Sequence, residues 1–424
     1  MFASLARRQI LADLFVVAWS VVKSRATYQR VICVCCFLLL FTNIGLPSSS
    51  FSVYQPYIAA MVGDGNASFV VGCRTGMSLL CMLLVGFWYK KLDCRLGMVL
   101  ATVLTVIGFL LYCRAQDMVL LCIAAAITGA AYGLGGMVGM TLLIGRWYRE
   151  RLGTAVGIAT MGSGFASLVI PLIATMIINN FGLTWSFAFE AILAALVAVI
   201  LFILLQNQPT DAEPMYSKDV KADGASARLD APQQDPILTP ALRHVMLFGM
   251  VLIGAVSVVG QSYLSILLTS LGFDHVFAAT MLSVNGVFLM VAKGANGWVF
   301  DKLGRRRGSV IFFSFLVVGI ALLCLTWTGS YVVAVVGASL MGIGVALATV
   351  GISVWSIDLS TPVERPALVK NMQIGYATGS FLYNLVPGTL AEVTGTYVST
   401  YLVCLVMAII CAACVLCTYR KLRR

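Results

Sequence analysis

Twelve long apolar runs, separated by short polar or charged segments, constrain the fold of this 424-residue chain more than any other feature. A helix of about 20 mostly apolar residues crosses the ~30 Å hydrocarbon core of a bilayer. The composition agrees, because 60% of the residues are hydrophobic, 11% are charged and the mean hydropathy is +0.96, values outside the range of soluble domains. We therefore predict an all-α membrane protein. The predicted transmembrane helices are 30–61, 69–89, 97–113, 118–145, 154–178, 185–205, 243–270, 275–300, 309–328, 331–357, 367–391 and 397–418.

The basic residues indicate how these helices are oriented. The chain carries a net charge of +11, and its lysines and arginines gather in alternate loops and at both ends. Such clusters stay on the cytoplasmic side of a membrane. We therefore expect both termini to be cytoplasmic and the protein to lie in the inner (cytoplasmic) membrane. The excess of basic residues is then explained by the orientation of the protein in the lipid bilayer, and no nucleic-acid partner is expected.

The polar segment 206–240 divides the chain into two halves of six helices each. It is rich in Pro, Asp, Gln, Lys and Ala, a composition that cannot bury a core and is typical of a flexible linker. Residues 1–29 contain an apolar stretch too short to cross the membrane, which suggests a helix lying at the interface. The predicted units are an N-terminal segment 1–29, a first bundle 30–205, the linker 206–240, a second bundle 241–418 and a basic tail 419–424.

The two halves are related by a weak internal repeat. Gly86-Phe-Trp-Tyr-Lys-Lys-Leu-Asp93 corresponds to Gly297-Trp-Val-Phe-Asp-Lys-Leu-Gly304, and both segments follow the second helix of their half. Parallel repeats of this kind imply two six-helix bundles related by an axis along the membrane normal, with a cavity between them. The sequence shows no nucleophile–base pair, metal cluster or phosphate loop, so neither an enzyme nor a cofactor is predicted.

The loop Gly297–Gly308, GWVFDKLGRRRG, resembles the cytoplasmic loop signature of the major facilitator superfamily, G-x-x-x-D-[RK]-x-G-[RK]-[RK]. The resemblance implies the twelve-helix major facilitator fold. It also implies that Gly297, Asp301, Gly304 and Arg305 form a gate that latches the cytoplasmic side in one state. The copy in the first half departs from the signature, since Lys90 stands where the aspartate is expected.

The segment Tyr132–Pro171 is similar to the oxalate/formate antiporter family and its monocarboxylate-porter relatives. The shared features are a glycine-rich fourth helix, an aromatic–basic loop at Arg146-Trp-Tyr148 and an R-x-G-x-A-x-G-I-A entry to the fifth helix that begins at Arg151. The resemblance implies a secondary transporter of a small organic anion. Arg146 and Arg151 are then candidate gating residues, and we expect the protein to function as a monomer.

Lys293 is the strongest candidate for binding an anion. It lies eight residues before Asp301, hence about 12 Å along a helix from the cytoplasmic end. A charge at this depth costs roughly 2.5–3.5 kcal/mol on insertion scales and so needs a reason to be there. In the resembled family an arginine at this position relative to Gly297 binds the substrate carboxylate. The other possibility is a lysine that reaches the interface or pairs with an acid on another helix.

Further candidate substrate contacts come from polar and aromatic residues within the spans. Tyr54 and Gln55 lie in a first span interrupted by prolines, as expected where a helix lines a cavity, and Gln261 and Tyr263 are their counterparts in the seventh span. Arg74 lies near the outer end of the second predicted span, where it could line an outer vestibule or extend to the interface.

The eleventh and tenth spans contribute the remaining candidates. Tyr376 and Trp355 could contact the non-carboxylate part of a substrate. Thr378 occupies the position where relatives that carry dicarboxylates have a second basic residue, so one anionic group is favoured over two.

Several functions remain open from the sequence alone. The absence of a central carboxylate favours anion exchange or uniport over proton symport. The same fold could instead carry a larger amphipathic or uncharged compound, or serve as a membrane sensor that transports nothing.

Overall fold

The computed structural model describes residues 25–148, 152–207, 238–361 and 364–421, and every regular element in these ranges is a helix. Eleven helices in this part of the chain are long and apolar enough to cross a membrane. Most of segment 1–29 and of linker 206–240 lies outside the described residues, as does the end of the 419–424 tail.

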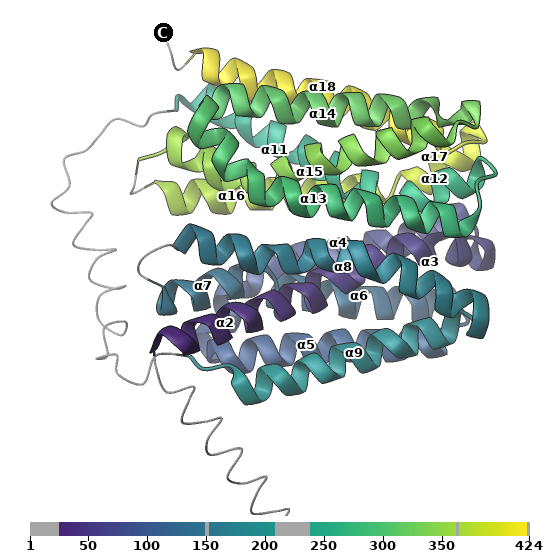
Figure 1. Ribbon diagram of the computed structural model, residues 1–424, viewed down its shortest axis with the longest axis horizontal. Helices are drawn as coiled ribbons and strands as arrows, with labels where there is room; N and C mark the ends of the chain where they lie inside the picture. Colours follow the sequence, from purple (N-terminus) through teal and green to yellow (C-terminus); the bar gives the residue numbers. More distant parts are fainter. Residues whose placement is uncertain (1–24, 149–151, 208–237, 362–363, 422–424) are drawn as a thin grey trace, which may run out of the picture.

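The helices of the two halves follow one another along the chain and run lengthwise through the molecule (Figure 1). The first half contains α2 (Arg25–Leu40), η1 (Phe41–Gly45), α3 (Leu46–Val62), α4 (Asp64–Lys91), α5 (Cys94–Arg114), α6 (Met118–Gly135), α7 (Met137–Trp147), α8 (Leu152–Phe181) and α9 (Leu183–Leu204). The second half contains α11 (Pro240–Ser262), α12 (Leu264–Ser270), α13 (His275–Leu303), α14 (Arg305–Cys324), η2 (Leu325–Thr328), α15 (Tyr331–Leu359), α16 (Arg365–Asn384), α17 (Pro387–Thr394) and α18 (Val398–Lys421).

Four predicted spans are interrupted rather than continuous. The first passes from α2 to α3 through the π-helical turn η1, next to Pro47, whose missing N–H disturbs the regular ladder. The fourth breaks at Gly136 and the seventh at Tyr263. The predicted span 367–391 is divided into α16 and α17 just before Pro387, and it is absent from the eleven helices that meet the length and hydropathy requirement.

Sharp turns join several consecutive helices. Gly63, between α3 and α4, has φ +87°, and Gly304, between α13 and α14, has φ +78°. Backbone with positive φ strains residues that carry a Cβ. The glycine that the superfamily signature places at 304 therefore has a local structural role.

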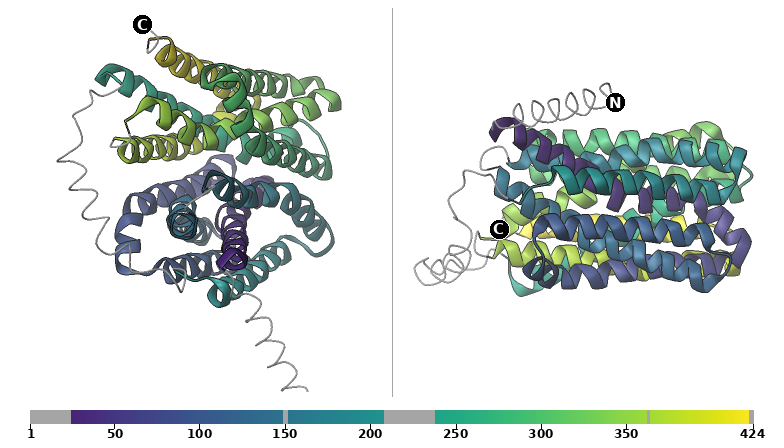
Figure 2. Two further views of the ribbon diagram at one scale, coloured as in Figure 1. Left: turned by 60° about the vertical axis from the view of Figure 1, so that its left-hand side comes forward. Right: turned by 90° about the horizontal axis from the view of Figure 1, so that it is seen from below.

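The helices form two bundles that lie against each other, α2–α9 below and α11–α18 above in Figure 1, and the left-hand view of Figure 2 shows them apart. The chain enters α2, leaves α9 and ends after α18 at the same end of the bundles, which we call the linker end. The opposite end, which we call the far end, holds the α3–α4 turn and α17.

Within each bundle, glycines bring selected helix pairs into backbone contact. A Cβ at Gly129 of α6 would lie 2.1 Å from the carbonyl oxygen of Arg74 in α4, and one at Gly254 of α11 would lie 2.0 Å from the carbonyl oxygen of Tyr376 in α16. Small residues allow such close approach of membrane helices. These two glycines thus fix the positions of two predicted site residues.

Candidate functional site

A cavity lies where the two bundles meet, between α4 and α6 of the first and α11 and α16 of the second. It encloses about 420 Å³ of space free of protein atoms, part of which is open to solvent. Its lining consists of Arg74, Thr75, Ser78, Met82, Tyr132, Val258, Tyr376, Ala377 and Ser380. The wall is therefore apolar and aromatic apart from one cation and three hydroxyl side chains.

Arg74 is the charged group of this cavity, and it lies deeper than the sequence suggested. Because α4 begins at Asp64, five residues before the predicted span, Arg74 lies ten residues along the helix, about 15 Å from its start. The side chain is 3% exposed, so of the two alternatives from the sequence, extension to the interface does not fit and a place in a cavity wall does.

The guanidinium of Arg74 has few partners. One Nη donates to the carbonyl oxygen of Pro47, the group lies 5.2 Å from the centre of the Phe51 ring, and Nε is buried without a partner. No carboxylate among the described residues lies within ion-pairing distance of it. A buried cation of this kind is normally paired or reserved for a ligand.

Tyr132 and Tyr376 face the same cavity from opposite bundles. Both side chains are partly exposed, and neither hydroxyl has a hydrogen-bond partner in the described part of the chain. Ser78 and Ser380 add hydroxyl groups from α4 and α16. The arrangement offers one anion-binding group together with two aromatic rings.

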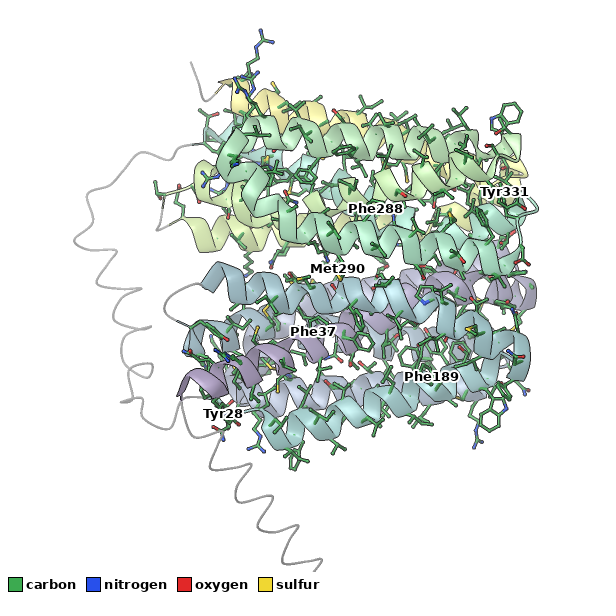
Figure 3. The ribbon with its side chains drawn as sticks, in the orientation of Figure 1. Tyr28, Phe37, Phe189, Phe288, Met290 and Tyr331 are labelled. Carbon is green, nitrogen blue, oxygen red and sulfur yellow. The ribbon has the colours of Figure 1, made fainter. Side chains whose placement is uncertain are left out.

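Lys293 does not line the cavity that contains Arg74. Its Nζ donates to Ser163 Oγ at 3.3 Å across the interface between α13 and α8, and the side chain is partly exposed. The same interface is tightly packed, since a Cβ at Gly164 would lie 3.1 Å from Cβ of Met290. Figure 3 shows Met290 on α13, where that helix meets the first bundle. Lys293 also has no carboxylate partner among the described residues.

Several predicted contacts lie in the cores of the bundles. The Tyr54 hydroxyl donates to Glu190 Oε1 (2.7 Å) and is within 2.8 Å of Ser186 Oγ. Trp355 is fully buried and donates from Nε1 to Ser309 Oγ at 2.9 Å. Neither residue lines the cavity, so a role for them in substrate contact stays a prediction.

The other predicted contacts lie near the cavity or between the bundles. Tyr376 lines the cavity. Thr378 lies two residues further on, and its hydroxyl donates to the carbonyl oxygen of Ile374 in the same helix. The side-chain amide of Gln55 is fully buried with no partner for either polar atom, and the Nε2 of Gln261 is likewise unpartnered. These amides stay candidates for contact with a ligand.

Glu190 is a carboxyl group whose depth the sequence analysis underestimated. It lies seven residues into α9, is fully buried, and its Oε2 has no hydrogen-bond partner. The absence of a central carboxylate that the sequence indicated therefore does not hold for the core of the first bundle. The position of Glu190 in this core, bonded to Tyr54, keeps it out of the cavity lining.

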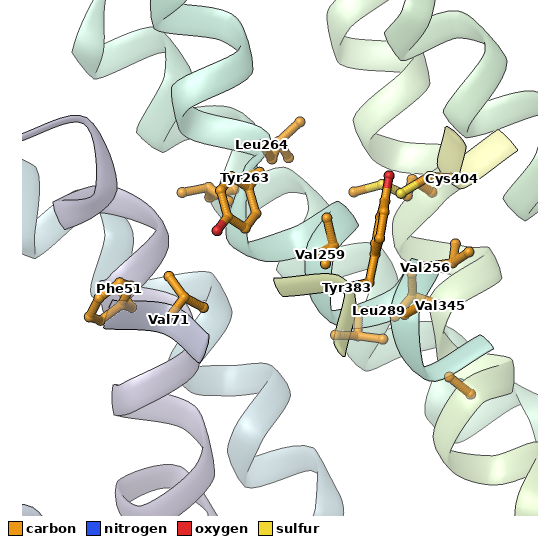
Figure 4. Packing of buried hydrophobic residues seen from close by; sticks show 14 of the residues in the cluster. Phe51, Val71, Val256, Val259, Tyr263, Leu264, Leu289, Val345, Tyr383 and Cys404 are labelled. Atoms are coloured by element: carbon orange, nitrogen blue, oxygen red, sulfur yellow. The ribbon is translucent and has the colours of Figure 1, made fainter. Parts of the chain in front are cut away.

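The far end of the interface between the bundles is closed by hydrogen bonds. Ser68 Oγ in α4 accepts bonds from the Tyr263 hydroxyl (3.0 Å) and from the N–H of Gly388 in α17 (2.7 Å). Glu392 Oε1 accepts a bond from the N–H of Gly65 at 2.6 Å, where the start of a helix favours a negative charge. Figure 4 shows Tyr263 facing the first bundle, on the side where Phe51 and Val71 lie.

A further contact at the same end joins the start of α4 to the start of α18. The Tyr397 hydroxyl donates to Asp64 Oδ1 at 2.7 Å. These four hydrogen bonds, which we call the far-end latch, join α4 to the second bundle.

The predicted gate residues are described only in part. The surroundings of Gly297, the side chain of Asp301 and the whole of Arg151 lie outside what the structure describes. Arg146 lies in the last turn of α7 and Arg305 begins α14, and both take part in interactions. Their function as a gate stays a prediction.

Sequence reasoning missed most of the hydroxyl groups and one aromatic residue of the cavity. Thr75, Ser78 and Ser380 were not singled out, and Tyr132 was noted only as the start of a glycine-rich segment. A signal was present, because Ser78 lies four residues after Arg74 and so on the same face of a helix. The pairing of Tyr132 with Tyr376 depends on how the bundles meet, which the sequence does not display.

Comparison with known proteins agrees with this architecture. The sequence model of the Major Facilitator Superfamily matches residues 31–307 and 245–424. Monocarboxylate transporter 12 of Rattus norvegicus is 24% identical over 369 residues, which cover 79% of this chain and 73% of that protein. MFS-type transporter pytF of Aspergillus terreus is 24% identical over 277 residues, 63% of this chain and 88% of that protein.

Solved structures show the same fold at low sequence identity. A D-xylose–proton symporter superposes with a TM-score of 0.73 at 15% identity, over 92% of this chain and 97% of that one. The nucleoside transporter NupG superposes with a TM-score of 0.65 at 15% identity, over 93% and 99% of the two chains. With the family match extending over nearly the whole described chain, this multi-pass membrane protein belongs to the major facilitator superfamily of transporters.

Proposed function

We propose that the protein is a secondary transporter of a small organic anion, whose carboxylate binds Arg74 in the cavity between the bundles. The observation that carries the proposal is the burial of this guanidinium in the cavity wall with an unpartnered Nε and no carboxylate partner among the described residues. An arginine fork matches the geometry of a carboxylate. An organic cation would meet only repulsion there.

The relatives support an anion as substrate. Those named monocarboxylate transporter 12 match most of this chain. One cation in the cavity suits one carboxylate, in agreement with Thr378 at the position where a second basic residue would favour a dicarboxylate.

Lys293 would act as a second attractive group along the interface between the bundles. It is partly exposed there, and its hydrogen-bond partner in the described part of the chain, Ser163, is neutral. We infer that Lys293 attracts the anion towards the cavity, while Arg74 holds it inside. This divides between two residues the function that the sequence analysis gave to Lys293 alone.

Transport would proceed by alternating access, in which one bundle rocks against the other. The far-end latch holds one end of the interface closed. Breaking its hydrogen bonds, and closing the linker end through Asp301 and Arg305, would give the opposite state. With the basic loops on the cytoplasmic side, the described state is closed on the outer side.

The test is uptake of labelled formate, oxalate, acetate and lactate into proteoliposomes, with and without internal anion. Protein-free liposomes measure leakage of the acids. The variants are Arg74→Gln, Lys293→Gln and, as a matched control, Arg114→Gln, which removes an exposed arginine at the end of α5.

We expect Arg74→Gln to abolish uptake, Lys293→Gln to reduce it and Arg114→Gln to leave it unchanged. Dependence on internal anion would establish exchange. Uptake by Arg74→Gln at the wild-type rate, or failure of every carboxylate, would overturn the anion proposal and favour an amphipathic or uncharged substrate.

A further inference from the structure

The wall of the cavity around Arg74 is more aromatic and apolar than a two- or three-carbon acid requires. Part of the roughly 420 Å³ that its lining encloses is open to solvent, so the lining residues, rather than the volume, indicate what the cavity binds. The lining residues other than Arg74 therefore indicate the chemistry of the part of the substrate beyond its carboxylate.

Three of the side chains lining that wall favour contact with an aromatic ring. Tyr132 and Tyr376 come from opposite bundles, and Met82 lies on α4 two turns after Arg74. Aromatic rings attract one another in stacked or edge-to-face arrangements, and a thioether packs well against a ring. Val258 and Ala377 add apolar side chains to the same wall.

Besides Arg74 and the two tyrosine hydroxyls, the polar side chains of the cavity come from three positions. Thr75 and Ser78 lie on α4 beside Arg74, and Ser380 lies on α16. The hydroxyl of Thr75 is already engaged, since it donates to the carbonyl oxygens of Val71 and Gly72. The hydroxyls of Ser78, Ser380 and the two tyrosines remain for a polar group of the substrate, and the rest of the wall is apolar.

We propose that the preferred substrate is an aromatic monocarboxylate, with its carboxylate on Arg74 and its ring against Tyr132 and Tyr376. This inference rests on the proposed function, because it assigns the remainder of an anion held by Arg74. Tyr132 and Tyr376 are then the residues that determine specificity for the body of the substrate. Their position on opposite bundles means that one ring contacts both halves of the transporter.

The experiment is calorimetric titration of the purified full-length protein in detergent with benzoate, cyclohexanecarboxylate and lactate. Benzoate and cyclohexanecarboxylate share the carboxylate and the six-membered ring and differ in aromaticity. The variants are Tyr132→Leu and Tyr376→Leu, which remove the ring, and Tyr132→Phe and Tyr376→Phe, which keep it. Tyr331→Leu is the matched control, because Tyr331 is 57% exposed at the start of α15.

We expect benzoate to bind more tightly than cyclohexanecarboxylate, and both more tightly than lactate. Each Leu variant should raise the Kd for benzoate by roughly three- to tenfold, the range expected for loss of an aromatic contact. The Kd for lactate should change less than twofold, which also shows that the variants are folded. The Phe variants and the Tyr331→Leu control should bind benzoate as the wild type does.

The outcomes separate the two proposals. If lactate binds as tightly as benzoate, or the Leu variants weaken both equally, the aromatic preference is wrong and the anion transporter stands. If none of the three acids binds, the proposed transport of an organic anion is wrong, and so is the aromatic preference that rests on it.

Discussion

The buried acid Glu190 illustrates how one side chain can be structural in a membrane protein. It is fully buried, accepts a hydrogen bond from Tyr54, and lies close to Ser186, which is within 2.8 Å of the same tyrosine hydroxyl. A charge in this environment is costly unless it is compensated, and no described residue forms an ion pair with it. We interpret the carboxyl group of Glu190 as a structural hydrogen-bond acceptor that links α9 to α3 through Tyr54.

This interpretation predicts the effect of two substitutions on stability. Glu190→Gln keeps an acceptor for Tyr54 and should change the unfolding free energy by less than about 1 kcal/mol, whereas Glu190→Leu should cost about 1–3 kcal/mol by leaving the Tyr54 hydroxyl without this partner. Thermal unfolding in detergent measures both. A large loss in Glu190→Gln would show that the charge itself is required.

The helices were largely predictable from the sequence, and so was the interruption of the first span by prolines. The interruptions of the other spans and the residues that face the cavity were not. Long apolar runs located the membrane spans because the period and length of such runs are local properties. The depth of Arg74 was underestimated because the first residues of α4, from Asp64, are polar and were not included in the predicted span. Tyr54 and Trp355 were chosen as aromatic residues in spans, yet which face a residue presents depends on the packing of neighbouring helices.

Close contact between helices positions the cavity residues, and this can be tested with two glycines. Gly129→Ala and Gly254→Ala would push the new methyl against the backbones of Arg74 and Tyr376. We expect each substitution to lower carboxylate transport by at least about tenfold and to destabilise the protein by about 1–3 kcal/mol through overpacking. Uptake and thermal unfolding measure the two effects.

Gly157→Ala is the matched control for these variants. It also lies in a membrane helix, α8, but a Cβ there meets nothing within 4 Å. We expect wild-type transport from it. Equal loss of transport in all three variants would contradict the assignment of a specific positioning role to Gly129 and Gly254.

The two bundles together form a transporter in which one end of their interface is closed. The far-end latch joins α4 to Tyr263, to α17 and to the residue before α18 in the other bundle, and Ser68 accepts two of its hydrogen bonds. Because the cavity lies between the same bundles, opening the far end requires these bonds to break. The latch should therefore set the balance between the two access states.

Hydrogen–deuterium exchange tests this balance directly. Glu392→Gln weakens the bond to the Gly65 N–H and Ser68→Ala removes the acceptor of the Gly388 N–H, so both variants should exchange these amides at least about fivefold faster than the wild type, a shift of about 1 kcal/mol. Thr394→Ala, which alters an exposed hydroxyl at the end of α17, is the control. Unchanged exchange at Gly65 and Gly388 in both variants would show that the latch does not hold the bundles together.

The most direct test of the central claim compares the binding of a carboxylate with that of its neutral amide. Lactate and lactamide, and benzoate and benzamide, each differ in the group that would meet Arg74. The account predicts that wild-type protein binds both acids at least about tenfold more tightly than their amides, a difference of about 1.4 kcal/mol, and that Arg74→Gln abolishes this preference. Equal binding of acid and amide by the wild type, or a preference that persists in Arg74→Gln, would contradict the claim that Arg74 holds an organic anion.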